Sequence, residues 1–157
     1  MALRNITVSA VLAICLAASL LIAAGCSGEM KVGTAGISEA TMCSGVNPQT
    51  GQPVDSVDIF DISAPEIFCS VKLSNASSDT EVLAVWIYIG GEIKDLSNHV
   101  IDEYTLTAEG NSYVFFSLSA SSNGWPQGDY VVKLYLDGRE KMTVPFTVRS
   151  TTLSYRL

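Results

Sequence analysis

Short apolar runs with alternating side chains, separated by turn residues about every ten positions, constrain the fold of this chain most. The clearest pair flanks Asp137-Gly138, with apolar residues at alternate positions over 130–136 and again over 142–148. Asp-Gly is a strong hairpin signal because both central residues of a type I′ turn need positive φ. Pro145 lacks an N–H, so we expect the second strand to pair on one side only at that position.

The same alternation predicts five more strands, with no convincing helix between them. These strands cover residues 57–62, 67–73, 82–89, 100–106 and 113–118. Both faces of 82–89 are apolar, which is typical of a central strand that is covered on both faces. Regularly spaced short strands favour a sandwich or barrel. We therefore predict that residues 54–150 form one all-β, antiparallel sandwich of about seven strands.

Three features resemble those of immunoglobulin-like and fibronectin-like domains, and one departs from them. Cys69 lies on the second predicted strand and Trp86 on the third, and Gly128-Asp129-Tyr130 resembles the start of a tyrosine corner. Val132 stands where antibody domains have their second cysteine. The resemblance therefore implies an immunoglobulin-like sandwich without the inter-sheet disulfide of antibodies. It implies a fold and no particular activity.

The N-terminal segment has the form of an export signal. A single positive charge, Arg4, precedes Ile6–Ala24, which is 19 uncharged residues long, and Ala23-Ala24-Gly25-Cys26 closes the run. This ending resembles the lipobox of bacterial lipoproteins, although Ala23 stands where that family usually has leucine. The resemblance implies that residues 1–25 are a signal peptide and that Cys26 is acylated and becomes the new N-terminus.

Two other fates of this segment stay open. The uncharged run approaches the ~20 residues that span a bilayer, so an uncleaved anchor is one alternative. Ordinary signal cleavage with release is the other, and all three fates export the rest of the chain. Ser27 follows Cys26 where an Asp would argue for inner-membrane retention. The resemblance thus implies the outer membrane in a two-membrane bacterium, or the outer face of the cell membrane otherwise.

Residues 26–53 are rich in glycine and proline and poor in bulky apolar side chains. This composition is typical of a flexible tether. We expect this segment to carry the lipid at Cys26 and to hold the sandwich away from the membrane, and residues 151–157 to form a C-terminal tail.

The positions of the four cysteines predict that only two of them remain available for pairing in the mature domain. Cys15 would leave with the signal peptide and Cys26 would carry lipid, so Cys43 and Cys69 remain. Two thiols in an exported domain favour a Cys43–Cys69 disulfide, and two unpaired buried thiols are the alternative. Neither cysteine belongs to a Cys-x-x-Cys pair or a histidine cluster, so we predict no metal site and no cofactor.

Residues for catalysis or ligand binding are few. His99 is the only histidine, and no serine lies in a Gly-x-Ser-x-Gly elbow, so we predict no enzyme. Asp55, Asp58 and Asp61 recur every three positions, which face opposite sides of a strand and cannot converge on a cation. Trp125 is the candidate for ligand contact, although capping of the sandwich end is the favoured role for its ring.

Charge and organisation together favour one function. Nine basic and 16 acidic residues give a net charge of −7, which argues against a nucleic-acid partner. We expect a lipid-anchored, extracytoplasmic interaction module held in the membrane through Cys26. Its loops would contact an envelope protein or a surface polymer. The alternative is a ligand-binding or sensory lipoprotein with a pocket between the sheets.

Overall fold

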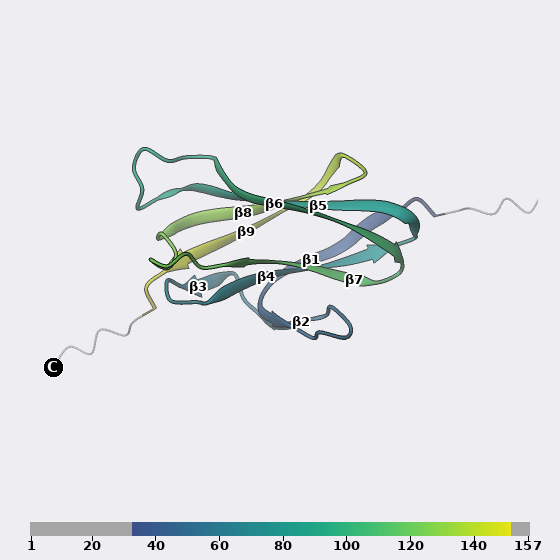
Figure 1. The fold of residues 1–157 in the computed structure, drawn as a ribbon, viewed down its shortest axis with the longest axis horizontal. Helices are drawn as coiled ribbons and strands as arrows, with labels where there is room; N and C mark the ends of the chain where they lie inside the picture. The colour runs from purple at the N-terminus through teal and green to yellow at the C-terminus, as the bar shows by residue number, and fades with distance from the viewer. Residues whose placement is uncertain (1–32, 152–157) are drawn as a thin grey trace, which may run out of the picture. The chain divides into compact units, whose positions relative to one another are not determined.

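The computed structural model describes residues 33–151, which form two packed β-sheets (Figure 1). The predicted all-β sandwich is confirmed, with nine strands in this part of the chain in place of about seven. Residues 33–151 include no helix long and apolar enough to cross a bilayer. The strands are β1 Gly36–Val46, β2 Pro53–Ser56, β3 Ile59–Asp61, β4 Glu66–Ser74, β5 Ala76–Gly91, β6 His99–Gly110, β7 Tyr113–Ser119, β8 Gly128–Leu136 and β9 Arg139–Arg149.

Several predictions concern residues that the structure does not describe. The signal peptide of residues 1–25, the lipidation site Cys26 and residues 152–157 of the predicted tail all lie outside the described range.

The first sheet has the strand order β2-β1-β4-β7, and the second has the order β3-β9-β8-β5-β6. Neighbouring strands are antiparallel, except that β3 runs parallel to β9. Figure 1 shows the two sheets as layers, with β5, β6, β8 and β9 in one and β1, β4 and β7 in the other. Strands β6 and β7 end their sheets on the same side of the sandwich and face a common groove.

The predicted tether over 26–53 is wrong from Gly36 onward. β1 pairs with β4 between Gly36 and Cys43 and with β2 between Cys43 and Val46. Met42 is 3% exposed and belongs to the core. Few side chains of β1 point inward, so its composition resembles that of a linker, while its backbone pairing holds it in the sheet. The sandwich therefore begins with β1 and not at residue 54.

Aromatic rings fill the centre of the sandwich. Trp86 of β5 and Tyr130 of β8 are 1% and 2% exposed, as the immunoglobulin-like pattern predicts. Phe146 of β9 stacks on Tyr130 with ring centroids 5.0 Å apart and meets the edge of Trp86 at 6.0 Å. The Tyr130 hydroxyl donates to the Pro126 carbonyl oxygen at 2.5 Å, the hydrogen bond of a tyrosine corner.

The predicted hairpin between β8 and β9 is confirmed. Asp137 and Gly138 have φ values of 49° and 75°, as a type I′ turn requires. Pro145 pairs with Val131 of β8, whereas β3 pairs with β9 only from Thr147 onward. The missing N–H of Pro145 therefore lies where β9 is paired on one side.

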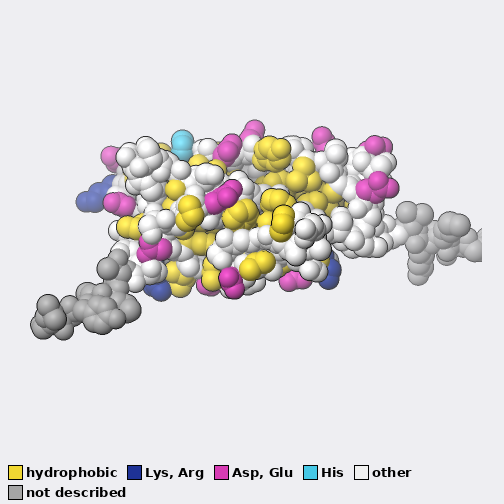
Figure 2. Space-filling model, turned by 60° about the horizontal axis from the view of Figure 1, so that its bottom comes forward, with side chains coloured by type: hydrophobic (Ala, Val, Ile, Leu, Met, Phe, Trp, Pro, Cys, Tyr) yellow, Lys and Arg dark blue, Asp and Glu magenta, His cyan; other side chains and the backbone are white. Residues whose placement is uncertain are grey.

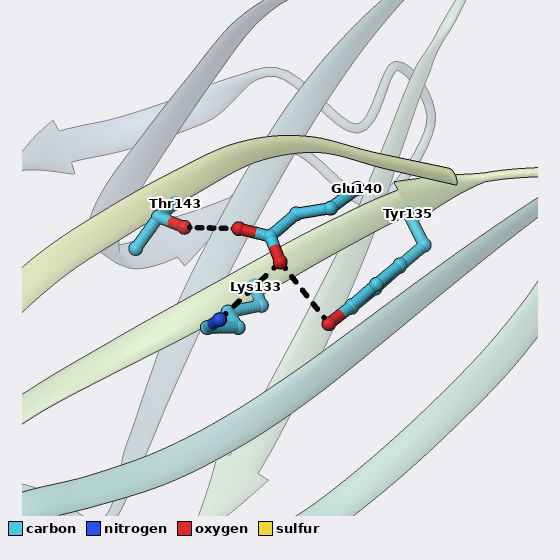
Figure 3. Close-up of polar contacts among 4 residues, drawn as sticks. All are labelled: Lys133, Tyr135, Glu140 and Thr143. Carbon is cyan, nitrogen blue, oxygen red and sulfur yellow. Dashed lines mark hydrogen bonds and ion pairs between the residues drawn. The ribbon is translucent and has the colours of Figure 1, made fainter. Parts of the chain in front are cut away.

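A polar cluster on the exposed side of this hairpin joins its two strands (Figure 3). The Glu140 carboxylate accepts hydrogen bonds from Lys133 Nζ at 3.2 Å, the Tyr135 hydroxyl at 3.3 Å and Thr143 Oγ1 at 3.1 Å. The bond from Lys133 is the main cause that lowers the pKa of Glu140. Lys133 and Tyr135 bond to Glu140 across the hairpin, and Thr143 bonds to it within β9, so we assign the cluster a structural role.

Candidate interaction surface

The side of the sandwich where both sheets end holds a large open hollow. β7 pairs only with β4, and β6 pairs only with β5. A groove of about 680 Å³ runs along these two edges. It is lined by Pro48, Gln49, Thr50, Gly51, Tyr104, Leu106, Thr107, Ser112, Tyr113, Val114, Phe115, Phe116 and Ser117.

Aromatic rings and uncharged polar groups make up this lining. None of the lining residues is an Asp, Glu, Lys, Arg or His. Tyr104 of β6 is 65% exposed and Phe115 of β7 is 40% exposed. Figure 2 shows a face of the molecule on which hydrophobic side chains lie exposed between acidic ones. Exposed rings in a hollow are typical of a contact surface.

Packing against buried or neighbouring rings positions both exposed aromatics. The Tyr104 ring meets the edge of the buried Phe116 ring, with centroids 6.4 Å apart. Phe115 points to the opposite face of β7, where its ring lies 6.4 Å from that of Phe68. The two exposed rings therefore flank the β7 edge, one on each side of the first sheet.

The loop over 47–52 forms one wall of the groove. Asn47 Oδ1 accepts hydrogen bonds from the backbone N–H groups of Gln49 and Thr50, and Ser70 Oγ donates to the Gly51 carbonyl at 2.7 Å. Gly51 has a φ of 71°, and a Cβ on it would lie 2.9 Å from the Tyr113 carbonyl oxygen. This close approach fixes the loop against the first residue of β7.

Trp125 lies at one end of the sandwich and matches the capping role. It is 7% exposed, its Nε1 donates to the Ala64 carbonyl at 2.7 Å, and its ring meets the edge of Tyr130 at 6.2 Å. The ring also lines an apolar hollow of about 260 Å³ beside Leu118. The hydroxyls of Tyr88 and Tyr130 there already donate to backbone carbonyls.

The predicted Cys43–Cys69 disulfide is wrong. Both cysteines are buried and free. Cys43 pairs with Phe68 and Cys69 pairs with Met42, so the two thiols are offset by one position and point to opposite faces of the first sheet. Cys69 faces the core, and burial raises the pKa of its thiol to about 12. The structure thus has the alternative arrangement of two unpaired buried thiols.

Among the described residues, neither His99 nor the acidic residues Asp55, Asp58 and Asp61 take part in a recognisable catalytic arrangement. His99 is exposed at the start of β6 and makes no side-chain hydrogen bond with residues 33–151. Asp61 accepts hydrogen bonds from Ser63 Oγ at 2.6 Å and from the Thr151 backbone N–H at 2.7 Å. These bonds hold the pKa of Asp61 far below its usual value. Across the described range, no cluster of acidic, His or Cys residues is arranged to hold a metal ion.

Comparison with known proteins identifies the fold. The structure is similar to that of an immunoglobulin-like protein from Pseudomonas aeruginosa, with a TM-score of 0.52 and 13% sequence identity, over 76% of this chain and 99% of that chain. The fold is immunoglobulin-like. No protein-family model matches the sequence, and no curated protein matches it.

Two larger enzymes contain parts that resemble this immunoglobulin-like domain less closely. An alkylpurine DNA glycosylase from Pseudomonas fluorescens has a TM-score of 0.47 and 12% identity, over 74% of this chain and 30% of that chain. A β-glucosidase from Listeria innocua has a TM-score of 0.43 and 10% identity, over 66% and 18%. Similarity this low carries no statement about function.

Tyr104 and Phe115 do not stand out in the sequence as candidate contact residues. Both lie on predicted strands, but their exposure follows from the strand order, which places β6 and β7 at the sheet edges. One local signal was present: Tyr113–Ser119 is a strand without a single charged residue, and strands of that kind are normally covered.

Proposed function

We propose that this protein is a lipid-anchored, extracytoplasmic interaction module without catalytic activity, and that it binds an envelope partner through the β6–β7 side. Lipid on Cys26 would hold the chain at the membrane. The immunoglobulin-like domain would then present its groove to the partner.

The groove is the observation that carries this proposal. It combines two unpaired strand edges with the exposed rings of Tyr104 and Phe115. Large rings supply much of the binding free energy at protein interfaces because they bury apolar area at a small entropic cost.

The lipobox-like sequence supports the anchoring part of the proposal. Three acyl chains on one N-terminal cysteine would bury many methylenes at ~0.8 kcal/mol each, which is ample for stable attachment. The net charge of −7 opposes attachment to anionic headgroups by the domain itself. A covalent lipid would therefore be the main link to the bilayer.

The alternative function, a ligand-binding protein with a pocket between the sheets, has less support. Rings of the core fill the centre of the sandwich, and the apolar hollow beside Trp125 has its tyrosine hydroxyls engaged. A ligand there would find few free polar groups to orient it.

Photo-crosslinking in intact membranes tests the docking side. A photoreactive phenylalanine analogue at position 104 of the full chain is expected to give a discrete adduct with an envelope component. The same analogue at Lys141, an exposed position of β9, is the matched control and should give none. A second change, Phe115→Asp, should reduce the adduct from position 104 about tenfold because it places a charge in the uncharged groove.

Two results would contradict this function. One is equal labelling from positions 104 and 141, which would mean that contact is not confined to the groove. The other is full labelling in the Phe115→Asp background, with its thermal unfolding unchanged.

A further inference from the structure

We propose that the groove takes an extended, positively charged segment of a partner protein, which adds as a strand to the free edge of β7. This inference rests on the proposed docking function and specifies its partner. β-strand addition of this kind derives its affinity from backbone hydrogen bonds and its specificity from alternating side chains.

β7 differs from the other three edge strands in having no protection against pairing. β2 and β3 span only four and three residues. β6 has register shifts along its pairing with β5 and carries Asp102, Glu103 and Glu109. β7 spans seven residues that include no charge and no proline, and it pairs with β4 without a register shift. Proteins normally shield such an edge, so an open one indicates a pairing site.

Two flanking hydrogen bonds show which backbone groups of β7 face outward. The Leu73 N–H donates to the Ser112 carbonyl at 2.8 Å, and the Ala120 N–H donates to the Pro65 carbonyl at 2.9 Å. Even-numbered residues of this stretch therefore bond toward β4. Because the direction alternates along an antiparallel strand, the odd-numbered residues direct their N–H and C=O groups to the open edge. Those residues are Tyr113, Phe115, Ser117 and Ser119.

The loop over 47–52 sets one limit of the open edge. Gly51 lies against the Tyr113 carbonyl, so the groove is closed at that residue. The groups of Phe115, Ser117 and Ser119 remain for a partner strand. Phe115 and Tyr104 would then contact its side chains on the two faces of the extended sheet.

Charge selects the partner. Asp102, Glu103 and Glu109 are exposed on β6 along the same side of the sandwich. Lys72 lies over the Tyr113 ring at 5.6 Å, at the closed end of the groove. A segment with uncharged alternating residues and basic ends therefore complements both the neutral edge and the acidic strand beside it. A second copy of this chain would bring two acidic β6 strands together, which disfavours self-pairing.

The test uses the full-length protein in detergent micelles and a synthetic peptide of alternating valine and serine with two lysines at each end. Ser117→Pro removes an outward N–H without removing a bond to β4, whereas the control Ser117→Ala keeps that N–H. We expect the lysine-ended peptide to bind wild type and Ser117→Ala equally and Ser117→Pro about tenfold more weakly. A glutamate-ended peptide should bind at least tenfold more weakly at low salt, and added salt should shrink that difference.

Amide hydrogen exchange on the wild-type chain tests the same inference if Ser117→Pro fails to fold. Addition of the lysine-ended peptide should slow exchange at Phe115, Ser117 and Ser119, while Leu118, which bonds to β4, should not change.

Four outcomes would overturn strand addition. They are equal peptide binding by the Pro and Ala variants, unchanged exchange at the odd-numbered amides, binding of a neutral glucan in place of either peptide, and dimerisation of the wild-type chain through β7. Crosslinking from position 104 together with equal binding by both Ser117 variants would retain the groove as the docking side and exclude backbone pairing.

Discussion

Replacing Trp86 by alanine is expected to lower the free energy of unfolding by about 3–5 kcal/mol. Trp86 is 1% exposed on β5, which lies between β6 and β8 in the second sheet. Its ring meets the edge of Phe146 at 6.0 Å, and Phe146 in turn stacks on Tyr130. The substitution removes apolar contacts at the centre of the sandwich and leaves a cavity that β-sheets cannot close by a small shift.

Urea unfolding followed by tryptophan and tyrosine fluorescence and by circular dichroism would measure this loss. Tyr104→Ala is the matched control, because it also removes a large ring but from a side chain that is 65% exposed. Its effect should stay within about 0.5 kcal/mol. Equal destabilisation by the two variants would mean that the ring cluster is not the core of the fold.

Gly128→Ala is expected to cost about 2–3 kcal/mol, the second large effect on stability. β5 ends at Gly90-Gly91 and β8 begins at Gly128, where the two strands approach closely. A Cβ on Gly128 would lie 2.3 Å from the Gly90 carbonyl oxygen and 2.8 Å from Tyr88 Cε2, and its φ is 156°. The backbone oxygen belongs to a paired strand and the Tyr88 hydroxyl donates to Gln127, so neither neighbour can move freely.

Gly45→Ala provides the control for this prediction. Gly45 also lies in a strand, but no atom lies within 4 Å of the Cβ that alanine would add. Its thermal midpoint should stay close to that of the wild type, whereas Gly128→Ala should lower the midpoint by several degrees. Similar midpoints for the two variants would show that the close approach of β5 and β8 relaxes at little cost.

Local alternation predicts the strands that have an apolar face, and it fails where the chain changes sheet. The pattern over 130–148 gave the hairpin because every second residue is apolar and the turn sequence is specific. The predicted strand at 57–62 corresponds only to short β3, and the preceding residues 53–56 pair in the other sheet as β2. That change of sheet depends on contacts with β1 and β9, which are distant in sequence.

The number of cysteines and the expected export of the chain led to a wrong prediction of a disulfide. Cys43 and Cys69 do lie on neighbouring, paired strands. The register that separates them by one position is set by the packing of the whole β1–β4 pair. A count of cysteines carries no information about that register.

The candidate groove also depends on contacts between residues that are distant in the sequence. Tyr104 and Phe115 come from different sheets, and only the strand order leaves both rings exposed beside a free edge. From the sequence, residues 100–106 gave only a weak strand pattern, because most side chains of β6 are exposed. The fold class was therefore predictable from the sequence, whereas the docking surface required the arrangement of the strands.

Intact-mass analysis of the membrane-extracted protein and of its Cys26→Ser variant would test directly whether acylation holds this domain outside the cell. The wild type should partition into the detergent phase and begin at an acylated Cys26, with residues 1–25 removed. The serine variant cannot form the thioether, so it should retain residues 1–25 and carry no lipid. A serine variant with unchanged processing and unchanged partitioning, or a wild type without lipid mass, would contradict the proposed anchor.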